Sequence, residues 1–258
     1  MSERVAGDID YARHGQGYAA QRRTDRRIEA YVHAALGDAR TVLNVGAGAG
    51  SYEPRDRIVV AVEPSKTMRA QRPPGLAPAI DATAESLPFD DAAFDAAMAI
   101  VTVHQWKDLA AGLRELRRVT RGPVLIMTAD GAALDRFWLS DYAPEMIAVE
   151  RRRYPPIDAI CTGLGGRCEV RSIPIPRDCV DGFSEAFYAR PEQLLDPAVR
   201  AAQSAWSFVE PARVEAAVAR LRADLESGAW DARYGEWRRR PEFEGSGRLI
   251  IGRRSGDS

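Results

Sequence analysis

The chain has 258 residues, of which 45% are hydrophobic, so it can bury one large core or a core with a modest second lobe. Its 36 basic and 37 acidic residues leave a formal net charge of -1, which provides no positive field to attract nucleic acid or an anionic membrane. Composition therefore favours a small-molecule partner, with no nucleic-acid partner and no membrane partner. A homo-oligomer stays open.

Three cysteines, Cys161, Cys168 and Cys179, form no CxxC pair, and their odd number argues against both a disulfide framework and a zinc cluster. We expect them to be reduced, and we expect no metal site. The N-terminal residues lack an apolar segment of signal-peptide length, and no later run approaches the roughly 18 apolar residues of a membrane span. A cytoplasmic location follows as an expectation.

The first half of the chain alternates between strand and helix patterns. Residues 24–36 have apolar positions at helical spacing, with Thr24 or Asp25 as the N-cap. A second amphipathic helix is predicted at 109–119. Short apolar runs of strand length occur at 41–45, 58–62, 94–101 and 124–128. This alternation predicts a doubly wound, mainly parallel, Rossmann-like α/β sheet.

The alternation ends after Asp130. Residues 131–160 have a helical and aromatic pattern, and the run Arg151 to Arg153 is interpreted as a solvated helix end. A strand is predicted at 168–176, a mostly helical stretch at about 180–240, and a terminal strand in GRLIIGRR. Because about 60 residues is too long for a hairpin connection, we expect a helical cap inserted before the last strand.

A glycine-rich loop follows the first strand in VLNVGAGAGSYEP. Gly46, Gly48 and Gly50, with Ala47 between the first two, let backbone amides approach a ligand closely. A tight strand-to-helix turn without a ligand is the alternative. The dinucleotide fingerprint GxGxxG has glycine at its sixth position, where this chain has Ser51, so a nucleoside with an amino-acid tail is favoured over a pyrophosphate. A nicotinamide-dependent reductase or epimerase remains a rival, disfavoured also by the absence of YxxxK.

An acidic residue, Glu63, stands at the end of the second strand, followed by Pro64. A carboxylate at this position can accept hydrogen bonds from both hydroxyl groups of a ribose. The alternative is a solvated strand end without a ligand. Its place one strand after the glycine loop favours the ribose interpretation.

Together with these two motifs, the segment DATAESLPFDDAAFDAAMAIVTVHQW at 81–106 resembles the type 11 methyltransferases, which are related to ubiquinone and menaquinone C-methyltransferases. The resemblance covers about residues 40–130 and implies a class I methyltransferase that uses S-adenosyl-L-methionine (SAM). In the family's first motif, LDLGCGTG, Asn44 stands where an aspartate is common. The family's GDAExLPF loop wraps the adenine, which implies contacts from Thr83, Ala84 and Glu85, with Thr83 in place of a common aspartate.

The resemblance also assigns the end of the fourth strand, residues 100–104, to the methyl-transfer site, with Val101 against the cofactor. The (N/D)PP(Y/F) segment of enzymes that methylate nucleobases or amides is absent there, which disfavours such substrates. The N-terminal DYARHGQGYAAQRRTDRRI resembles an opening in which a tyrosine and an arginine close over the methionine end of SAM. Tyr18 and Arg22 fit this role, with Tyr11 and Arg27 as companions, and a surface helix is the alternative.

His104 is the histidine nearest the expected methyl donor, and it can take a proton from an acceptor hydroxyl as a general base. The alternative is that it orders the loop or packs at the strand end. Trp106 is interpreted as a pocket wall. Many aromatic residues in the C-terminal half suit an apolar or aromatic acceptor.

These patterns predict an enzyme that transfers a methyl group from SAM to a small organic molecule, such as a secondary metabolite or a quinone-like or aromatic acceptor. Carbon, oxygen and nitrogen all remain open as the accepting atom. A methyltransferase fold that binds or scaffolds without methyl transfer is the other alternative. We expect three parts: an N-terminal helical lid at 1–36, a SAM-binding core at 37–130, and residues 131–258, which complete the sheet and carry the cap.

Overall fold

A computed structural model describes residues 21–256, and among these residues seven strands form one sheet in the order β3-β2-β1-β4-β5-β7-β6. The strands are β1 (Thr41–Val45), β2 (Ile58–Val62), β3 (Ala79–Ile80), β4 (Ala96–Ile100), β5 (Val124–Ala129), β6 (Arg167–Pro176) and β7 (Glu242–Arg253). Strands β1 to β5 pair in parallel, whereas β7 is antiparallel to both β5 and β6. The predicted doubly wound, mainly parallel sheet is confirmed, and the two-residue strand β3 is the one that the sequence did not reveal.

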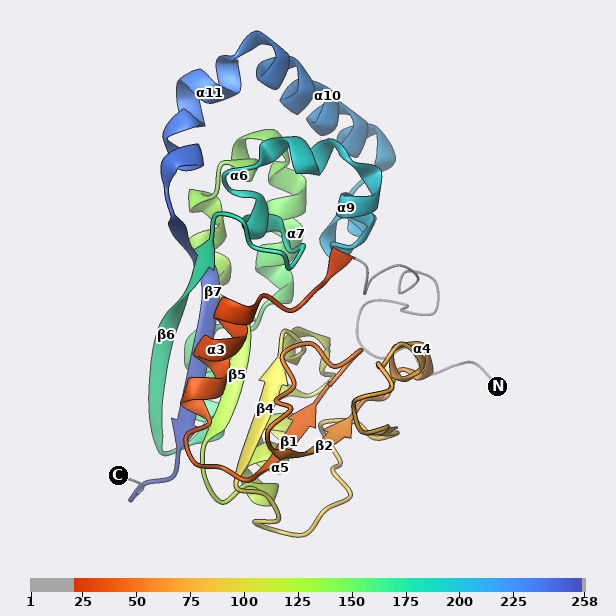
Figure 1. Cartoon of the computed structure of the whole chain (residues 1–258), viewed down its shortest axis with the longest axis vertical. Helices are drawn as coiled ribbons and strands as arrows, with labels where there is room; N and C mark the ends of the chain where they lie inside the picture. The colour runs from red at the N-terminus through yellow and green to blue at the C-terminus, as the bar shows by residue number, and fades with distance from the viewer. Residues whose placement is uncertain (1–20, 257–258) are drawn as a thin grey trace.

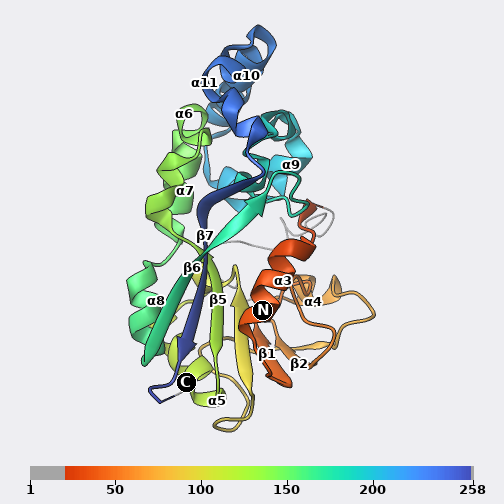
Figure 2. The same cartoon turned by 60° about the vertical axis from the view of Figure 1, so that its left-hand side comes forward.

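Helices cover both faces of the sheet (Figure 2). On one face lie α5 (Leu109–Val119) and α8 (Ile157–Leu164), and on the other lies α3 (Arg26–Ala35). Successive side chains of a strand point to opposite faces. Val42 accordingly packs in the cluster that contains the apolar side chains of α3, whereas Leu43 packs in the cluster of α5 and α8. Two separate cores therefore hold the sheet between its helix layers.

The helix patterns read from the sequence have local causes. Asp25 is the N-cap of α3, and its carboxylate accepts a hydrogen bond from the Arg27 N–H at 3.0 Å. Asp108 caps α5 in the same way through the Ala111 N–H at 2.9 Å. Helix α5 has the predicted bounds 109–119 and buries its apolar stripe against the sheet. Of the two predicted caps of the first helix, Asp25 is therefore the one observed.

A helical cap lies above the carboxyl ends of the parallel strands (Figure 1). Its α-helices are α6 (Leu139–Tyr142), α7 (Pro144–Arg153), α9 (Pro197–Ala201), α10 (Pro211–Ser227) and α11 (Ala229–Tyr234). Short 3₁₀ helices occur within it at 131–136, 184–187, 191–195, 204–208 and 235–239. Buried aromatic rings hold the cap together, with Trp138 and Trp230 packed edge to face at 5.4 Å. A further short helix, α4 (Lys66–Ala70), follows β2.

Two of the three cysteines are not reduced, so that expectation is wrong for Cys161 and Cys168, which form a disulfide between α8 and β6. The reason is a tight reversal between these elements at Gly165 and Gly166, both with positive φ, which brings the two Cα atoms to 5.6 Å. Cys179 is a buried free thiol, as expected.

The interpretation of the Arg151 to Arg153 run as a solvated helix end is wrong for Arg153, whose side chain is only 8% exposed. The end of α7 packs against the 204–208 turn of the cap. Arg153 there donates a hydrogen bond to the Ser204 hydroxyl at 2.7 Å and lies over the Phe208 ring. Arg151 and Arg152 are exposed, as expected.

Leu113→Ala should lower the free energy of unfolding by about 2–5 kcal/mol, because Leu113 is fully buried between the sheet and α8 and its removal leaves a cavity. Denaturant titration followed by circular dichroism measures this loss. Ile58→Ala is the matched control, since Ile58 is 67% exposed and should lose less than about 1 kcal/mol. Equal losses in the two variants would contradict the assignment of this core.

Candidate functional site

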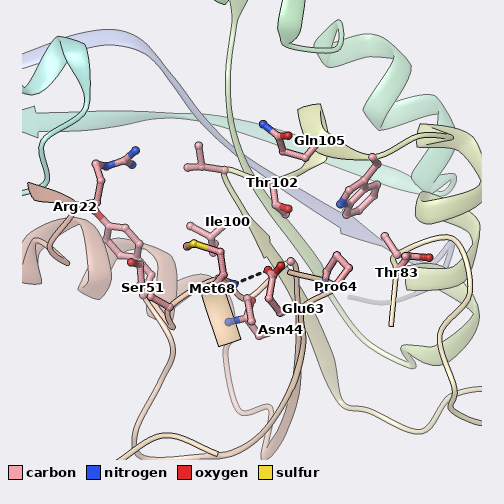
Figure 3. A pocket seen from close by; sticks show the side chains of 18 of the residues that line it. Arg22, Asn44, Ser51, Glu63, Pro64, Met68, Thr83, Ile100, Thr102 and Gln105 are labelled. Atoms are coloured by element: carbon pink, nitrogen blue, oxygen red, sulfur yellow. Dashed lines mark hydrogen bonds between the residues drawn. The ribbon is translucent and has the colours of Figure 1, made fainter. Parts of the chain in front are cut away.

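One pocket opens at the carboxyl ends of β1, β2 and β4, and we call it the donor pocket (Figure 3). The ligand-binding residues predicted from the sequence that line it are Arg22, Gly46, Ala47, Gly48, Glu63, Pro64, Thr83, Ala84, Glu85 and Val101. Predicted Gly50 does not line it, and Tyr18 and Tyr11 lie outside the described residues. Ile100 and Thr102 also line it, and both belong to the segment 100–104 that the resemblance assigned to the methyl-transfer site. Sequence reasoning did not assign six further lining residues: Ala49, Ser51, Tyr52, Met68, Gln105 and Lys107.

The three glycines of the loop all have positive φ, and they differ in what surrounds them. A Cβ atom at Gly46 would lie 2.0 Å from the Thr102 hydroxyl, and one at Gly50 would lie 2.2 Å from Leu76 Cδ1. A Cβ atom at Gly48 would meet nothing closer than 3.4 Å. Gly46 and Gly50 therefore allow close packing of the loop, whereas Gly48 leaves space on the pocket side. The expected ligand contact of Gly50 has no support in this geometry.

Glu63 is buried and is bound to the glycine loop. Its Oε2 accepts a hydrogen bond from the Gly48 N–H at 2.9 Å, and its Oε1 accepts one from the Ser65 N–H at 2.7 Å. Burial raises the pKa of this carboxyl above its usual value even with both hydrogen bonds present. The alternative of a solvated strand end is wrong, because only 7% of the residue is exposed. Each oxygen retains accepting capacity for hydroxyl groups in the pocket.

A buried polar network below the loop was not predicted. Asn44 donates from Nδ2 to Glu53 Oε2 at 3.0 Å, and Arg72 donates to both Glu53 oxygens at 2.9 Å. Asn44 Oδ1 has no hydrogen-bond partner within residues 21–256, although Asn44 lines the donor pocket. A buried carbonyl oxygen of this kind fits a ligand that brings an N–H donor. The available signal was Glu53 itself, which lies within the loop motif nine residues after Asn44.

The loop predicted to wrap an adenine closes on itself through a bridge between Thr83 and Ser86. Ala84 is buried at its centre. Glu85 accepts hydrogen bonds from the Lys107 and Asp108 N–H groups at 2.8 and 3.3 Å, so its carboxylate attaches the loop to the segment that follows β4. Glu85 therefore positions this loop relative to the segment after β4.

Trp106 lines the donor pocket, where the sequence predicted a wall. Its six-membered ring lies against Gly112 of α5, and a Cβ atom at that glycine would lie 2.5 Å from Trp106 Cε3. The glycine in α5 therefore makes room for the indole beside the pocket.

A second pocket lies between the sheet and the cap, and we call it the acceptor pocket. Apolar groups form most of the surface of this pocket, although polar side chains are as numerous in its lining. The apolar lining residues are Val101, Met127, Ala129, Leu134, Met146, Ile147, Ile173, Ile175, Phe183 and Ala202. Arg22 and Val101 line both pockets, so the two pockets meet at these residues. Val101 has a φ of 50°, which a β-branched residue adopts rarely and at an energetic cost. Its N–H donates to the Met127 carbonyl at 2.8 Å, which holds it in this conformation.

His104 lines the acceptor pocket and not the donor pocket. It lies in the 3₁₀ helix Val103–Gln105 directly after β4, and its ring centroid is 4.8 Å from that of Tyr154. The sequence predicted a histidine beside the methyl donor, and His104 lines the pocket that meets the donor pocket at Arg22 and Val101.

Two carboxyl groups, Glu150 and Glu185, line the acceptor pocket, and neither was predicted. Burial raises the pKa of both groups. Glu185 is nevertheless well bound, because Ser246 donates its N–H at 2.9 and 3.0 Å and its hydroxyl at 2.6 Å to the two carboxyl oxygens. Their sequence context, within helical stretches of the cap, carried no signal that distinguishes them from surface acids.

Asp181 connects both pockets to the N-terminal segment. Its carboxylate accepts a hydrogen bond from Arg22 Nε at 2.6 Å and another from the Tyr52 hydroxyl at 2.8 Å. Arg22 and Tyr52 line the donor pocket, and Figure 3 shows Arg22 beside the glycine loop. Burial and the Asp181 charge raise the pKa of the Tyr52 hydroxyl, so it remains a proton donor at neutral pH. Arg22, which was predicted to contact the cofactor, is thus held at the donor pocket by an acid that lies 159 residues later in the sequence.

Within residues 21–256, no cluster of three or more histidine, cysteine, aspartate or glutamate side chains is arranged to hold a metal ion. None of the helices in the described part of the chain has the length and apolarity needed to cross a membrane.

One solved structure is similar along nearly its whole length. It comes from Anabaena variabilis and carries the description "Putative methyltransferase from antibiotic biosynthesis pathway". The two sequences are 30% identical, the match covers 90% of this chain and 98% of that one, and the TM-score is 0.83. The chain belongs to the class I SAM-dependent methyltransferases. The methyltransferase-domain family model also matches residues 43–126, which include the glycine loop, Glu63 and His104.

More distant structures share the methyltransferase fold. A SAM-dependent methyltransferase of Thermotoga maritima, described as a possible histamine N-methyltransferase, is 16% identical, with 95% of this chain and 92% of that one covered and a TM-score of 0.52. The cyclase SpnF is also 16% identical, with 89% and 81% covered and a TM-score of 0.53. No curated protein sequence matches the chain. Membership of the methyltransferase family makes the chain an enzyme and removes the reductase and epimerase alternative.

Asp181→Asn should lower the free energy of unfolding by about 1.5–3 kcal/mol, because it removes the buried negative charge that accepts hydrogen bonds from Arg22 and Tyr52. Asp178→Asn is the matched control, since its ion pair with Arg27 is exposed and should contribute less than about 1 kcal/mol. Chemical denaturation of both variants makes the comparison. A loss in Asp181→Asn no larger than in the control would show that the buried contact does not hold the pockets together.

Proposed function

We propose that this methyltransferase transfers the methyl group of SAM to a small organic acceptor held in the acceptor pocket. The observation that carries the proposal is the junction of the two pockets at Arg22 and Val101. A methyl group presented from the donor pocket would there face a nucleophile presented from the acceptor pocket. Methyl transfer is an in-line displacement, and such an arrangement aligns the two reactants and excludes water.

The donor pocket fits SAM in three of its parts. Glu63 would accept hydrogen bonds from the ribose hydroxyl groups, and the Ala84 segment would contact the adenine, as the sequence implied. The unpaired Oδ1 of Asn44 offers an acceptor to the amino group of the methionine end. Bound SAM supplies an activated methyl group on its sulfonium. Arg22, with Tyr18 of the N-terminal lid, would close this end, as proposed from the sequence.

On the acceptor side, the protein orients the nucleophile and, where its pKa requires it, removes a proton. His104 lines this pocket, which supports a role as the general base or as an orienting group. A weakly acidic phenol or enol would need alignment alone.

The acceptor class that we propose is apolar or aromatic, as in secondary metabolites and quinone-like compounds. The mostly apolar wall of the pocket supports it. The description of the Anabaena variabilis relative, which refers to antibiotic biosynthesis, agrees with a secondary metabolite. We also propose that the enzyme is cytoplasmic and has no nucleic-acid partner. Conversion of SAM to S-adenosylhomocysteine in the presence of such acceptors tests the proposed acceptor class, and binding of SAM without turnover of any of these acceptors would refute it.

Glu63→Ala should reduce SAM affinity about tenfold or more, since a hydrogen bond to a charged group contributes on the order of 1.5–3 kcal/mol. Isothermal titration calorimetry measures the dissociation constant. Asp81→Ala is the control, because this carboxylate is exposed, pairs with Arg69 and does not line the pocket. Unchanged SAM affinity in Glu63→Ala would disprove the ribose assignment.

His104→Ala should lower kcat by roughly 10²–10⁴-fold if His104 is the general base, with SAM affinity nearly unchanged. The wild-type rate should then fall at acidic pH, because a protonated imidazole cannot accept a proton. If His104 only orients the acceptor, His104→Gln should retain much of the activity, and the loss should appear as a higher KM for the acceptor. His33→Ala is the control, since His33 lines neither pocket. Wild-type kcat and KM in His104→Ala would eliminate both roles.

A further inference from the structure

Gln203 is a buried amide in the cap wall of the acceptor pocket. It lies between α9 and the 204–208 turn, and only 4% of the residue is exposed. Burial of a polar side chain away from water costs free energy unless its hydrogen-bonding groups are paired. Its partners therefore indicate what the pocket is built to bind.

Two neighbours determine how this amide is oriented. Trp206 donates from Nε1 to Gln203 Oε1 at 3.1 Å, and the Ser184 hydroxyl donates to the same oxygen at 2.7 Å. An indole N–H can only donate, so the atom that faces Trp206 must be the amide oxygen and not the nitrogen. The other atom of the amide, Nε2, is therefore the NH₂ donor.

The Nε2 of Gln203 has no hydrogen-bond partner anywhere in residues 21–256. An unpaired buried N–H carries a desolvation cost of about 1–3 kcal/mol, which a ligand that accepts its hydrogen bond would recover. Thr128, at the end of β5, is a second case on the sheet side of the pocket, since its buried hydroxyl also lacks a partner within the described chain. The pocket thus has hydrogen-bonding groups without a partner in the described chain on two of its walls.

The charges in the pocket restrict the kind of oxygen that this amide can bind. Glu150 and Glu185 line the same pocket, and burial raises the pKa of both, so the pocket disfavours a carboxylate charge. The carboxylate of an acceptor would meet the same desolvation cost there. Arg22 is the opposing charge, and it is already paired with Asp181. A neutral oxygen, such as that of a ketone, quinone or amide, avoids this desolvation cost.

We infer that the Gln203 amide donates a hydrogen bond to a neutral carbonyl oxygen of the methyl acceptor and thereby selects carbonyl-bearing acceptors. This inference rests on the proposed function of the acceptor pocket and adds a specificity-determining residue to it. A site that is built to bind an oxygen discriminates against analogues that lack it, because its own polar group is then left unpaired.

Binding of matched compound pairs tests the inference. A hydroxynaphthoquinone is compared with the corresponding naphthol, and a hydroxychalcone with its analogue without the ketone, by calorimetry on protein saturated with S-adenosylhomocysteine. The wild-type protein should bind the carbonyl compound of at least one pair about tenfold more tightly, as expected for one hydrogen bond to a buried group. Gln203→Met, which has a similar shape but no donor, should reduce this ratio to about one.

Ser184→Ala is the matched control, because it removes one hydrogen bond to Oε1 and leaves the NH₂ donor in place; it should keep most of the discrimination. If Gln203→Met does not fold, Gln203→Glu replaces it at alkaline pH. Its carboxylate can still accept hydrogen bonds from Trp206 and Ser184 but has no N–H to donate.

A wild-type ratio near one in every pair, binding of none of the probes, or a ratio that survives both Gln203 variants would overturn the inference. SAM affinity and SAM turnover, measured separately on the wild-type protein, report on the proposed function. Loss of carbonyl discrimination with normal SAM binding in the variants supports the role of Gln203. An absence of SAM binding in the wild-type protein would instead refute methyl transfer itself.

Discussion

The buried carboxylate of Asp181 joins three segments that are distant in sequence. It lies just after β6, it pairs with Arg22 ahead of α3, and it accepts the hydroxyl hydrogen bond of Tyr52 in the loop after β1. The backbone of this region is bridged as well, since Arg22 and Asp181 form an isolated antiparallel pair. Because one carboxylate satisfies both partners in a site that excludes water, the position of the cap and the shape of the donor pocket depend on the same contact.

The parallel sheet explains why two pockets meet under this cap. Parallel strands all end at one edge, so the glycine loop, Glu63 and Val101 gather there, and an α/β enzyme binds its ligands along that edge. Val101 keeps a costly left-handed conformation at the junction, and its hydrogen bond to β5 helps to maintain it. The polar groups of the two pockets come in part from different regions: Asn44 and Glu63 of the donor pocket lie at the carboxyl ends of β1 and β2, whereas Gln203 and Glu150 of the acceptor pocket come from the cap.

Local patterns predicted the local elements well. The bounds of α5 and the Asp25 cap of α3 follow from short-range rules, in which an N-cap side chain satisfies a backbone N–H and apolar residues recur at helical spacing. Strand β3 escaped because two residues carry no periodicity. The Cys161–Cys168 disulfide and the buried Arg153 were predicted wrongly, since each depends on how two elements pack and not on the spacing within either one.

By itself, the sequence determined the order of strands and helices, the glycine loop, and the acid at the tip of β2, because each of these is encoded in a few consecutive residues. Only the tertiary structure decided which of the two pockets His104 lines, and it alone revealed the Asn44 network, Asp181 and the oriented amide of Gln203. The physical reason is that burial and hydrogen-bond pairing are properties of a site assembled from distant segments. From the sequence alone, an acid or an amide in a helical stretch is predicted to be exposed, and only the folded structure shows whether it is buried and hydrogen-bonded.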